Sequence, residues 1–103
     1  MAQFDVYRNP SESVSRIPYL LDAQSDLLSR STTRIVVPLA RTSEFNRVMM
    51  RLNPSFEVEG IAVMMLTLEL AGVPRSRLGS PIASLAKQRD TIRDALDFAF
   101  QGF

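Results

Sequence analysis

The chain has 103 residues, of which 46% are hydrophobic, so it fits one globular domain over residues 1–103 rather than a disordered segment. It contains no Cys and no His, which excludes disulfides, thiolate or imidazole catalysis and the usual zinc ligands, so no cofactor or metal is expected. The formal net charge of +1 gives no general reason to expect binding to nucleic acid or to a membrane.

The first part of the chain predicts three strands. Gln3–Arg8 alternates apolar and polar side chains, and the turn-forming run Asn9–Ser13 follows it. Pro18–Gln24 predicts a second strand. The β-branched run Arg34–Leu39 predicts a third, buried strand, in which Pro38 marks the end of the strand or a sheet edge.

The middle of the chain mixes a less regular segment with further strands. Thr42–Leu52 has apolar residues at three- and four-residue steps, which indicates a short helix or a turn. Ser55–Glu59 predicts a strand, and a tight reversal at Gly60 joins it to another strand over Ile61–Leu70. A short strand over Arg75–Leu78 is a further candidate.

The last segment predicts the one helix, with Ser84 as its N-cap. One face is apolar and the other is charged, as listed here: Leu85, Ile92, Leu96, Ala99 and Phe103 against Lys87, Asp90, Asp94 and Asp97. Acidic residues near a helix C-terminus oppose the helix dipole, at a cost of about 0.3–1 kcal/mol each. Either Arg93 pairs with Asp97 and offsets this cost, or Asp94 and Asp97 face a partner.

The order of these elements predicts the fold class. Five or six short strands followed by one helix indicate a mostly β protein, built as a small barrel or curled antiparallel sheet with the helix packed against it. We expect Val36 and Leu68 to lie in the barrel interior.

The residue inventory favours binding over catalysis. An enzyme needs a base, a nucleophile or a metal in a positioned cluster, and the carboxylates of this chain are scattered along predicted strands and turns. The four glycines are not grouped into a phosphate-binding loop. We therefore expect no catalytic residues and a protein that acts by binding.

Arginine dominates the basic residues of the chain. Compositional bias is one explanation, and contact with acidic side chains of a protein ligand is the other. The candidates for such contacts are Arg8, Arg16, Arg34 and Arg51.

The location is expected to be cytoplasmic. The N-terminal run MAQFDVYRNP lacks the basic and apolar regions of a signal peptide. The most apolar stretch, Ile61–Val73, is too short to cross a bilayer and carries Glu69. We therefore expect no membrane partner.

Several stretches together resemble a known family. QFDVY, LLDAQSDLL, RIVVPLA, MMLTLELAGVP and the final FQGF follow one another in the order and spacing of the CcdB toxins of toxin–antitoxin modules. The resemblance covers essentially the whole chain. It implies an SH3-like barrel of antiparallel strands with a C-terminal helix, a homodimer, and a toxin that is not an enzyme.

The resemblance also implies the partners. CcdB toxins bind the A subunit of DNA gyrase and trap the covalent gyrase–DNA cleavage complex. A CcdA-like antitoxin removes the toxin from gyrase and joins it in repressing the operon, so the toxin meets operator DNA only through the antitoxin. The four arginines would then be antitoxin contacts.

The family's gyrase contact centres on its last three residues, Trp-Gly-Ile, which correspond here to Gln101, Gly102 and Phe103. Gly102 matches and Gln101 departs from the pattern. Four more residues match gyrase-site positions of the family: Leu27, Leu28, Asp97 and Phe100. The same helix end implies a dimer interface that includes Leu96, Ala99 and Phe103.

Two other functions stay open at this point. Toxins with the same barrel cleave RNA, and Arg75 and Arg77 are the nearest candidates for such a site. Alternatively, Gln101 marks a homologue that binds its antitoxin and regulates its operon without poisoning gyrase.

Overall fold

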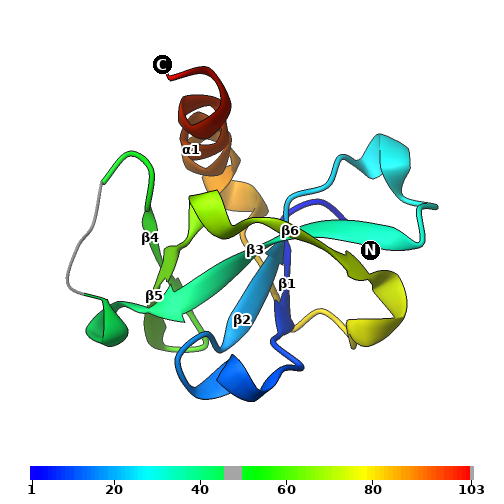
Figure 1. Ribbon diagram of the computed structural model, residues 1–103, viewed down its shortest axis with the longest axis horizontal. Coiled ribbons are helices and arrows are strands. Elements are labelled where there is room, and N and C mark those ends of the chain that lie inside the picture. The colour runs from blue at the N-terminus through cyan, green and yellow to red at the C-terminus, as the bar shows by residue number, and fades with distance from the viewer. Residues whose placement is uncertain (46–49, 103) are drawn as a thin grey trace.

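A computed structural model describes residues 1–45 and 50–102, which form a strongly curled antiparallel sheet and one helix (Figure 1). The strands of the described residues are β1 (Asp5–Arg8), β2 (Tyr19–Asp22), β3 (Thr33–Arg41), β4 (Ser55–Val58), β5 (Ile61–Met65), β6 (Ala71–Pro74) and β7 (Ala83–Ser84), and the helix is α1 (Arg89–Gln101). The sheet order is β4-β5-β3-β2-β1-β7, and β6 pairs with the first half of β3. This is the mostly β barrel with a C-terminal helix that the sequence predicts.

The long strand β3 organises the barrel because it pairs with three neighbours. Its first half pairs with β6, its middle and second half with β2, and its C-terminal end with β5. The register places Val37 opposite Leu21, which in turn lies opposite Val6 on β1. Successive residues of a strand face opposite sides, so these three side chains share the inner face.

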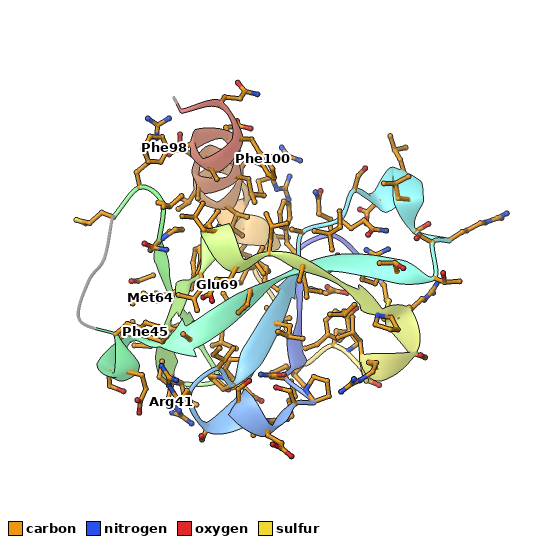
Figure 2. All side chains as sticks on the ribbon, in the orientation of Figure 1. Arg41, Phe45, Met64, Glu69, Phe98 and Phe100 are labelled. Atoms are coloured by element: carbon orange, nitrogen blue, oxygen red, sulfur yellow. The ribbon has the colours of Figure 1, made fainter. Side chains whose placement is uncertain are left out.

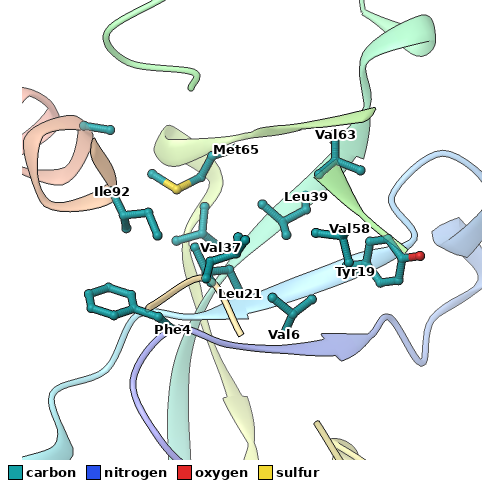
Figure 3. Packing of buried hydrophobic residues seen from close by; sticks show 12 residues of the cluster. Phe4, Val6, Tyr19, Leu21, Val37, Leu39, Val58, Val63, Met65 and Ile92 are labelled. Atoms are coloured by element: carbon teal, nitrogen blue, oxygen red, sulfur yellow. The ribbon is translucent and has the colours of Figure 1, made fainter. Parts of the chain in front are cut away.

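The main core fills the inside of the curled sheet. Figure 3 shows the side chains of the strands meeting there, with Ile92 of α1 closing one end of the core. Ile92 and Ala95 are the fully buried residues of α1, three positions apart on one helix face. The core consists of Phe4, Val6, Tyr19, Leu21, Val37, Leu39, Val58, Val63, Met65, Leu85, Ile92 and Ala95.

The outer face of the sheet carries a second, smaller core. Val36 packs there with Tyr7, Leu20 and Leu78, beneath the segment that contains β6. Val36 is therefore buried as expected, but on the face opposite the main core. The prediction for Leu68 is wrong, because its side chain is 70% exposed.

The end of β5 explains the exposure of Leu68. The strand stops at Met65 and a 3-10 helix follows over Thr67–Glu69. Thr67 is the buried residue of this helix, and its hydroxyl donates a hydrogen bond to the Leu52 carbonyl oxygen. With Thr67 turned inward, its neighbour Leu68 projects toward solvent.

Two leucine truncations test this assignment of the core. Leu21→Ala removes a fully buried side chain and should lower the free energy of unfolding by about 2–5 kcal/mol. Leu68→Ala should change it by less than about 0.5 kcal/mol, because the side chain is exposed. Urea unfolding followed by circular dichroism measures both. Equal losses in the two variants would contradict the structure.

Two local predictions need correction, the start of the helix and the strand over Arg75–Leu78. Ser84 is the last residue of β7 rather than a helix N-cap, because pairing of Asp5 with Ser84 keeps the backbone extended there. The helix begins only at Arg89, after a 3-10 helix over Ala86–Gln88. The segment Arg75–Arg77 is a 3-10 helix, and the strand lies just before it as β6.

The ambiguous segment Thr42–Leu52 is resolved in part. It contains a 3-10 helix over Thr42–Glu44, and its residues 46–49 lie outside the described part of the chain. Among the described residues, no helix has the length and apolar character needed to cross a membrane.

Candidate functional site

Two segments carry exposed large apolar side chains. In Figure 1 one is the cyan turn at the upper right and the other is the end of α1 at the top. The first is the 3-10 helix Asp26–Leu28, where Leu27 is 94% exposed and Leu28 is also exposed. The second is the last turn of α1, where Phe100 is 72% exposed. Met50 and Leu68 are exposed as well, but they belong to neither segment. Exposed apolar side chains that lie side by side, or at the end of a helix, are candidates for an interaction site.

The Asp26–Leu28 segment owes its shape to local capping. Ser25 is its N-cap, and the Ser25 hydroxyl accepts a hydrogen bond from the Leu27 amide at 3.2 Å. The Asp26 carboxylate accepts a hydrogen bond from the backbone amide of Gln3 at 2.7 Å, which ties the segment to the N-terminal residues. The Gln-Ser-Asp run of the sequence therefore shapes a turn whose two leucines face solvent.

The end of α1 is shaped by Gly102. This residue has a left-handed backbone with φ of +77°, and its amide donates a hydrogen bond to the Phe98 carbonyl oxygen at 2.9 Å. Glycine is the usual residue at this position, because a Cβ makes left-handed backbone unfavourable. Gln101 and Gly102 are exposed, and the predicted site residue Phe103 lies outside the described residues.

Gly102 therefore offers a test of the helix end. Gly102→Ala should fray the last turn by about 1 kcal/mol, because alanine disfavours the left-handed backbone. Apart from its two chain neighbours, no atom of the described residues lies within 4 Å of the added Cβ, so a steric clash with the rest of the fold would not explain the effect. Gly102→Asn should fray it less, since asparagine tolerates this conformation. Amide hydrogen exchange at position 102 is the measurement, and equal exchange in all three proteins would contradict this role.

The two aromatic residues of the helix end have different surroundings. Figure 2 shows Phe98 and Phe100 on opposite sides of α1. Phe98 is half-buried, and the Arg51 guanidinium lies 4.8 Å from the centre of its ring. The Arg51 Nε also donates to the Asp94 carboxylate at 3.0 Å. The side with Phe98 is thus covered by the chain itself, and the side with Phe100 is open.

Asp94 and Asp97 of α1 also differ in their surroundings, because only Asp94 has a partner within the described chain. Asp94 pairs with Arg51, which accounts for its place near the negative end of the helix dipole. The expected pair between Arg93 and Asp97 does not form, because the Arg93 guanidinium lies over the ring of Phe4 at 5.8 Å. Asp97 is exposed and forms no ion pair with any residue that the structure describes.

The four candidate arginines do not form one surface. Arg8 pairs with Glu59 at 3.1 Å, and Arg16 lies 5.5 Å from the ring of Phe45. These two flank the connection between β1 and β2, whereas Arg51 lies against α1.

The prediction that Arg34 contacts a partner is corrected. Arg34 is fully buried on the outer face of β3, in the half of the strand that pairs with β6. Its Nε and Nη2 donate to one oxygen of the equally buried Asp22, at 3.0 and 2.6 Å. Burial raises the pKa of Asp22, while hydrogen bonds from the Gln24 amide and Arg34 act in the opposite direction. A guanidinium in this position cannot reach a protein ligand.

The remaining predicted residues lie on α1. Leu96 packs against the main core and Ala99 is half-buried, so both are only partly open to a second subunit. Sequence reasoning missed one residue that extends this surface. Leu68 is exposed on a 3-10 helix that contacts α1. The local pattern gave no signal for this, because Leu66, Leu68 and Leu70 alternate with Thr67 and Glu69 as in a strand.

A hollow of about 280 Å³ lies on the outer face of the sheet. Leu20, Val36 and Pro38 are among its apolar lining residues, and Glu69 and Arg77 are its charged ones. The exposed Leu27, Leu28 and Phe100 do not line it. In the described part of the chain, no group of three or more acidic side chains is placed to hold a metal ion.

Comparison with protein families gives one match. The family model described as CcdB protein matches residues 3–102, which is nearly the whole chain. The match includes both exposed apolar segments, at Asp26–Leu28 and at the end of α1 up to Gly102.

Proposed function

The chain belongs to the CcdB family, the toxins of toxin–antitoxin modules, and we propose that it poisons DNA gyrase by binding its A subunit and trapping the gyrase–DNA cleavage complex. The toxin performs no bond chemistry itself. It inserts apolar side chains into gyrase and holds the enzyme at the stage at which both DNA strands are cut. Gyrase acts in the cytoplasm, so the proposal places the toxin there.

The exposure of three apolar side chains carries the proposal. Leu27, Leu28 and Phe100 match gyrase-site positions of the family, and all three are exposed in this structure. Each fully buried side chain of this size contributes about 1.5–3 kcal/mol, which the fold gives up here. Binding to a larger partner would recover that energy. Asp97, also exposed, would contact the partner beside them.

The antitoxin and dimer belong to the same proposal. A CcdA-like antitoxin would neutralise the toxin through contacts of its acidic side chains with Arg8, Arg16 and Arg51. Operator DNA would be contacted only through the antitoxin. A homodimer through Leu96, Ala99 and position 103 would place two helix ends side by side, so that one gyrase receives both.

The replacement of the family Trp by Gln101 is expected to weaken gyrase binding. An aromatic pair contributes about 0.5–1.5 kcal/mol beyond its buried area, which corresponds to roughly 2- to 13-fold in affinity. Gln101 is exposed at the end of α1, so a Trp can be accommodated there. Gln101→Trp should therefore strengthen the poisoning.

The direct test uses purified gyrase, supercoiled DNA, ATP and the protein, with linear DNA after denaturation as the readout. Linear DNA is expected with the wild-type protein, and more with Gln101→Trp. An absence of linear DNA with the gyrase of its own host, together with tight antitoxin binding, would identify a homologue that regulates without poisoning. RNA cleavage is the second candidate, and no observation favours it. Arg75 donates to the Ser29 carbonyl oxygen, and in the described part of the chain neither Arg75 nor Arg77 forms an ion pair with an acidic side chain.

A further inference from the structure

The side chain of Gln24 connects the sheet to the exposed leucines. Gln24 lies just after β2, is buried, and uses both ends of its amide group. Its Oε1 accepts a hydrogen bond from the Ile35 amide at 2.9 Å, and its Nε2 donates to the Leu28 carbonyl oxygen at 3.0 Å. Since the Ala23 amide donates to the Ile35 carbonyl oxygen, Gln24 extends the β2–β3 ladder by one step.

Gln24 is itself held by the buried ion pair. Oδ1 of Asp22 accepts a hydrogen bond from the backbone amide of Gln24 at 3.0 Å. Oδ2 of Asp22 accepts hydrogen bonds from Nε and Nη2 of Arg34. Asp22 and Arg34 have fully buried side chains. A buried hydrogen-bonded chain therefore runs from β3 through Asp22 and Gln24 to the carbonyl of Leu28. Both oxygens of Asp22 and both ends of the Gln24 side-chain amide have partners, although Nη1 of Arg34 has none among the described residues. Satisfied polar chains restrict motion, so the Asp22–Gln24 part of the chain should be rigid.

The carbonyls at the end of the Asp26–Leu28 helix are the groups that need partners. The last carbonyls of a helix have no partner within it and accept hydrogen bonds from side chains or water. The Leu28 carbonyl oxygen accepts two hydrogen bonds at 3.0 Å, one from the Ser31 backbone amide and one from the side chain of the buried Gln24. The Ser29 carbonyl oxygen accepts from the exposed Arg75 at 3.0 Å. Gln24 is therefore the buried side chain that ties this turn to the sheet. Leu27 is 94% exposed, so its own side chain does little to hold the turn.

We infer that Gln24 is a positioning residue, which holds the Asp26–Leu28 turn in the orientation that presents Leu27 and Leu28 to the partner. The inference rests on the proposed function for the identity of that partner. Gln24 does not touch gyrase. It acts by removing the freedom of the turn before binding, so that the entropy of ordering the two leucines is not lost when gyrase binds.

Two substitutions separate the two hydrogen bonds of Gln24. Gln24→Met keeps an unbranched side chain and loses both bonds. Gln24→Glu keeps an oxygen for the Ile35 amide but loses the donor to the Leu28 carbonyl oxygen.

Asn9→Leu is the matched control. Asn9 is a buried amide whose Nδ2 donates to the Ile17 carbonyl oxygen at 2.8 Å and whose Oδ1 accepts from the Ser11 amide. It holds the other Ser-capped 3-10 helix, Glu12–Ser15, which the gyrase proposal does not use.

Two measurements are made on each full-length variant, well below its melting temperature. One is hydrogen exchange of the peptide that spans residues 25–32, and the other is gyrase affinity. Both Gln24 variants should exchange about tenfold faster in this peptide and bind gyrase about tenfold more weakly. Asn9→Leu should lower the melting temperature and leave both measurements unchanged.

Two results would overturn the inference. The first is a Gln24→Met protein that loses stability like Asn9→Leu but keeps wild-type exchange in the turn. The second is faster exchange with unchanged gyrase affinity. If the wild-type protein does not bind gyrase at all, the proposed function fails, and faster exchange of the turn in Gln24→Met still supports the positioning role.

Discussion

Asp22→Ala should lower the free energy of unfolding by about 3–5 kcal/mol, because it leaves the guanidinium of Arg34 buried without its counter-charge. Both side chains are fully buried, and the shortest N–O distance between them is 2.6 Å. The loss is far larger than that expected for an exposed pair. Asp94→Ala, which breaks the half-exposed pair with Arg51, should cost no more than about 1 kcal/mol and is the matched control.

The same pair should be replaceable as a unit. Arg34 Nη1 and the nearby Tyr7 hydroxyl have no hydrogen-bond partner among the described residues. The hydrogen-bonding capacity of the buried guanidinium is therefore only partly satisfied. The double variant Asp22→Leu with Arg34→Met should therefore recover most of the stability that Asp22→Ala loses. It should stay about 1–3 kcal/mol below wild type, because the buried Gln24 backbone amide loses its acceptor on Asp22. Urea unfolding of the single and double variants measures the difference. A double variant as unstable as Asp22→Ala would show that the buried charges themselves stabilise the fold.

Deletion of residues 101–103 should abolish toxicity and leave the fold intact. Ile92 and Ala95 anchor α1 in the main core, whereas Gln101 and Gly102 are exposed. Induction in the native host, with the number of surviving cells and the SOS response as readouts, measures the effect on toxicity. Far-UV circular dichroism and antitoxin binding should remain near wild type. Loss of the Gly102 helix cap alone accounts for about 1 kcal/mol. A fall in melting temperature of more than about 10 °C, equivalent to about 2 kcal/mol, would show that the deleted tail belongs to the core.

A pair of point variants makes this test more specific. Phe100→Ser and Val14→Ser each replace an exposed apolar side chain, one at the end of α1 and one on the 3-10 helix Glu12–Ser15. Each should change the stability by less than about 0.5 kcal/mol. Only Phe100→Ser should reduce toxicity. Equal loss of toxicity in both would indicate a general loss of the protein in cells rather than a lost gyrase contact.

The course of the chain follows largely from local patterns. Alternation of apolar and polar side chains indicates β1 and β4, and the apolar runs indicate β2 and β3, because each of these strands turns a face toward a core. The three- and four-residue spacing of apolar residues indicates α1 in the same way. The family resemblance adds the identity of the two exposed segments, which no local pattern assigns to a partner.

The sequence by itself thus determined the fold class, the order of most elements and the family. Only the tertiary structure decided which side chains are covered. Arg34 is buried with Asp22 as its counter-charge. Asp22 on β2 lies opposite Val36, which is two residues after Arg34 on the same face of β3. The pairing of β2 with β3 therefore brings the two charges together, and neither strand alone shows it. Leu68 is exposed because Thr67 takes the inward position after β5. Burial depends on what packs over a residue, and the elements that pack here come from distant parts of the chain.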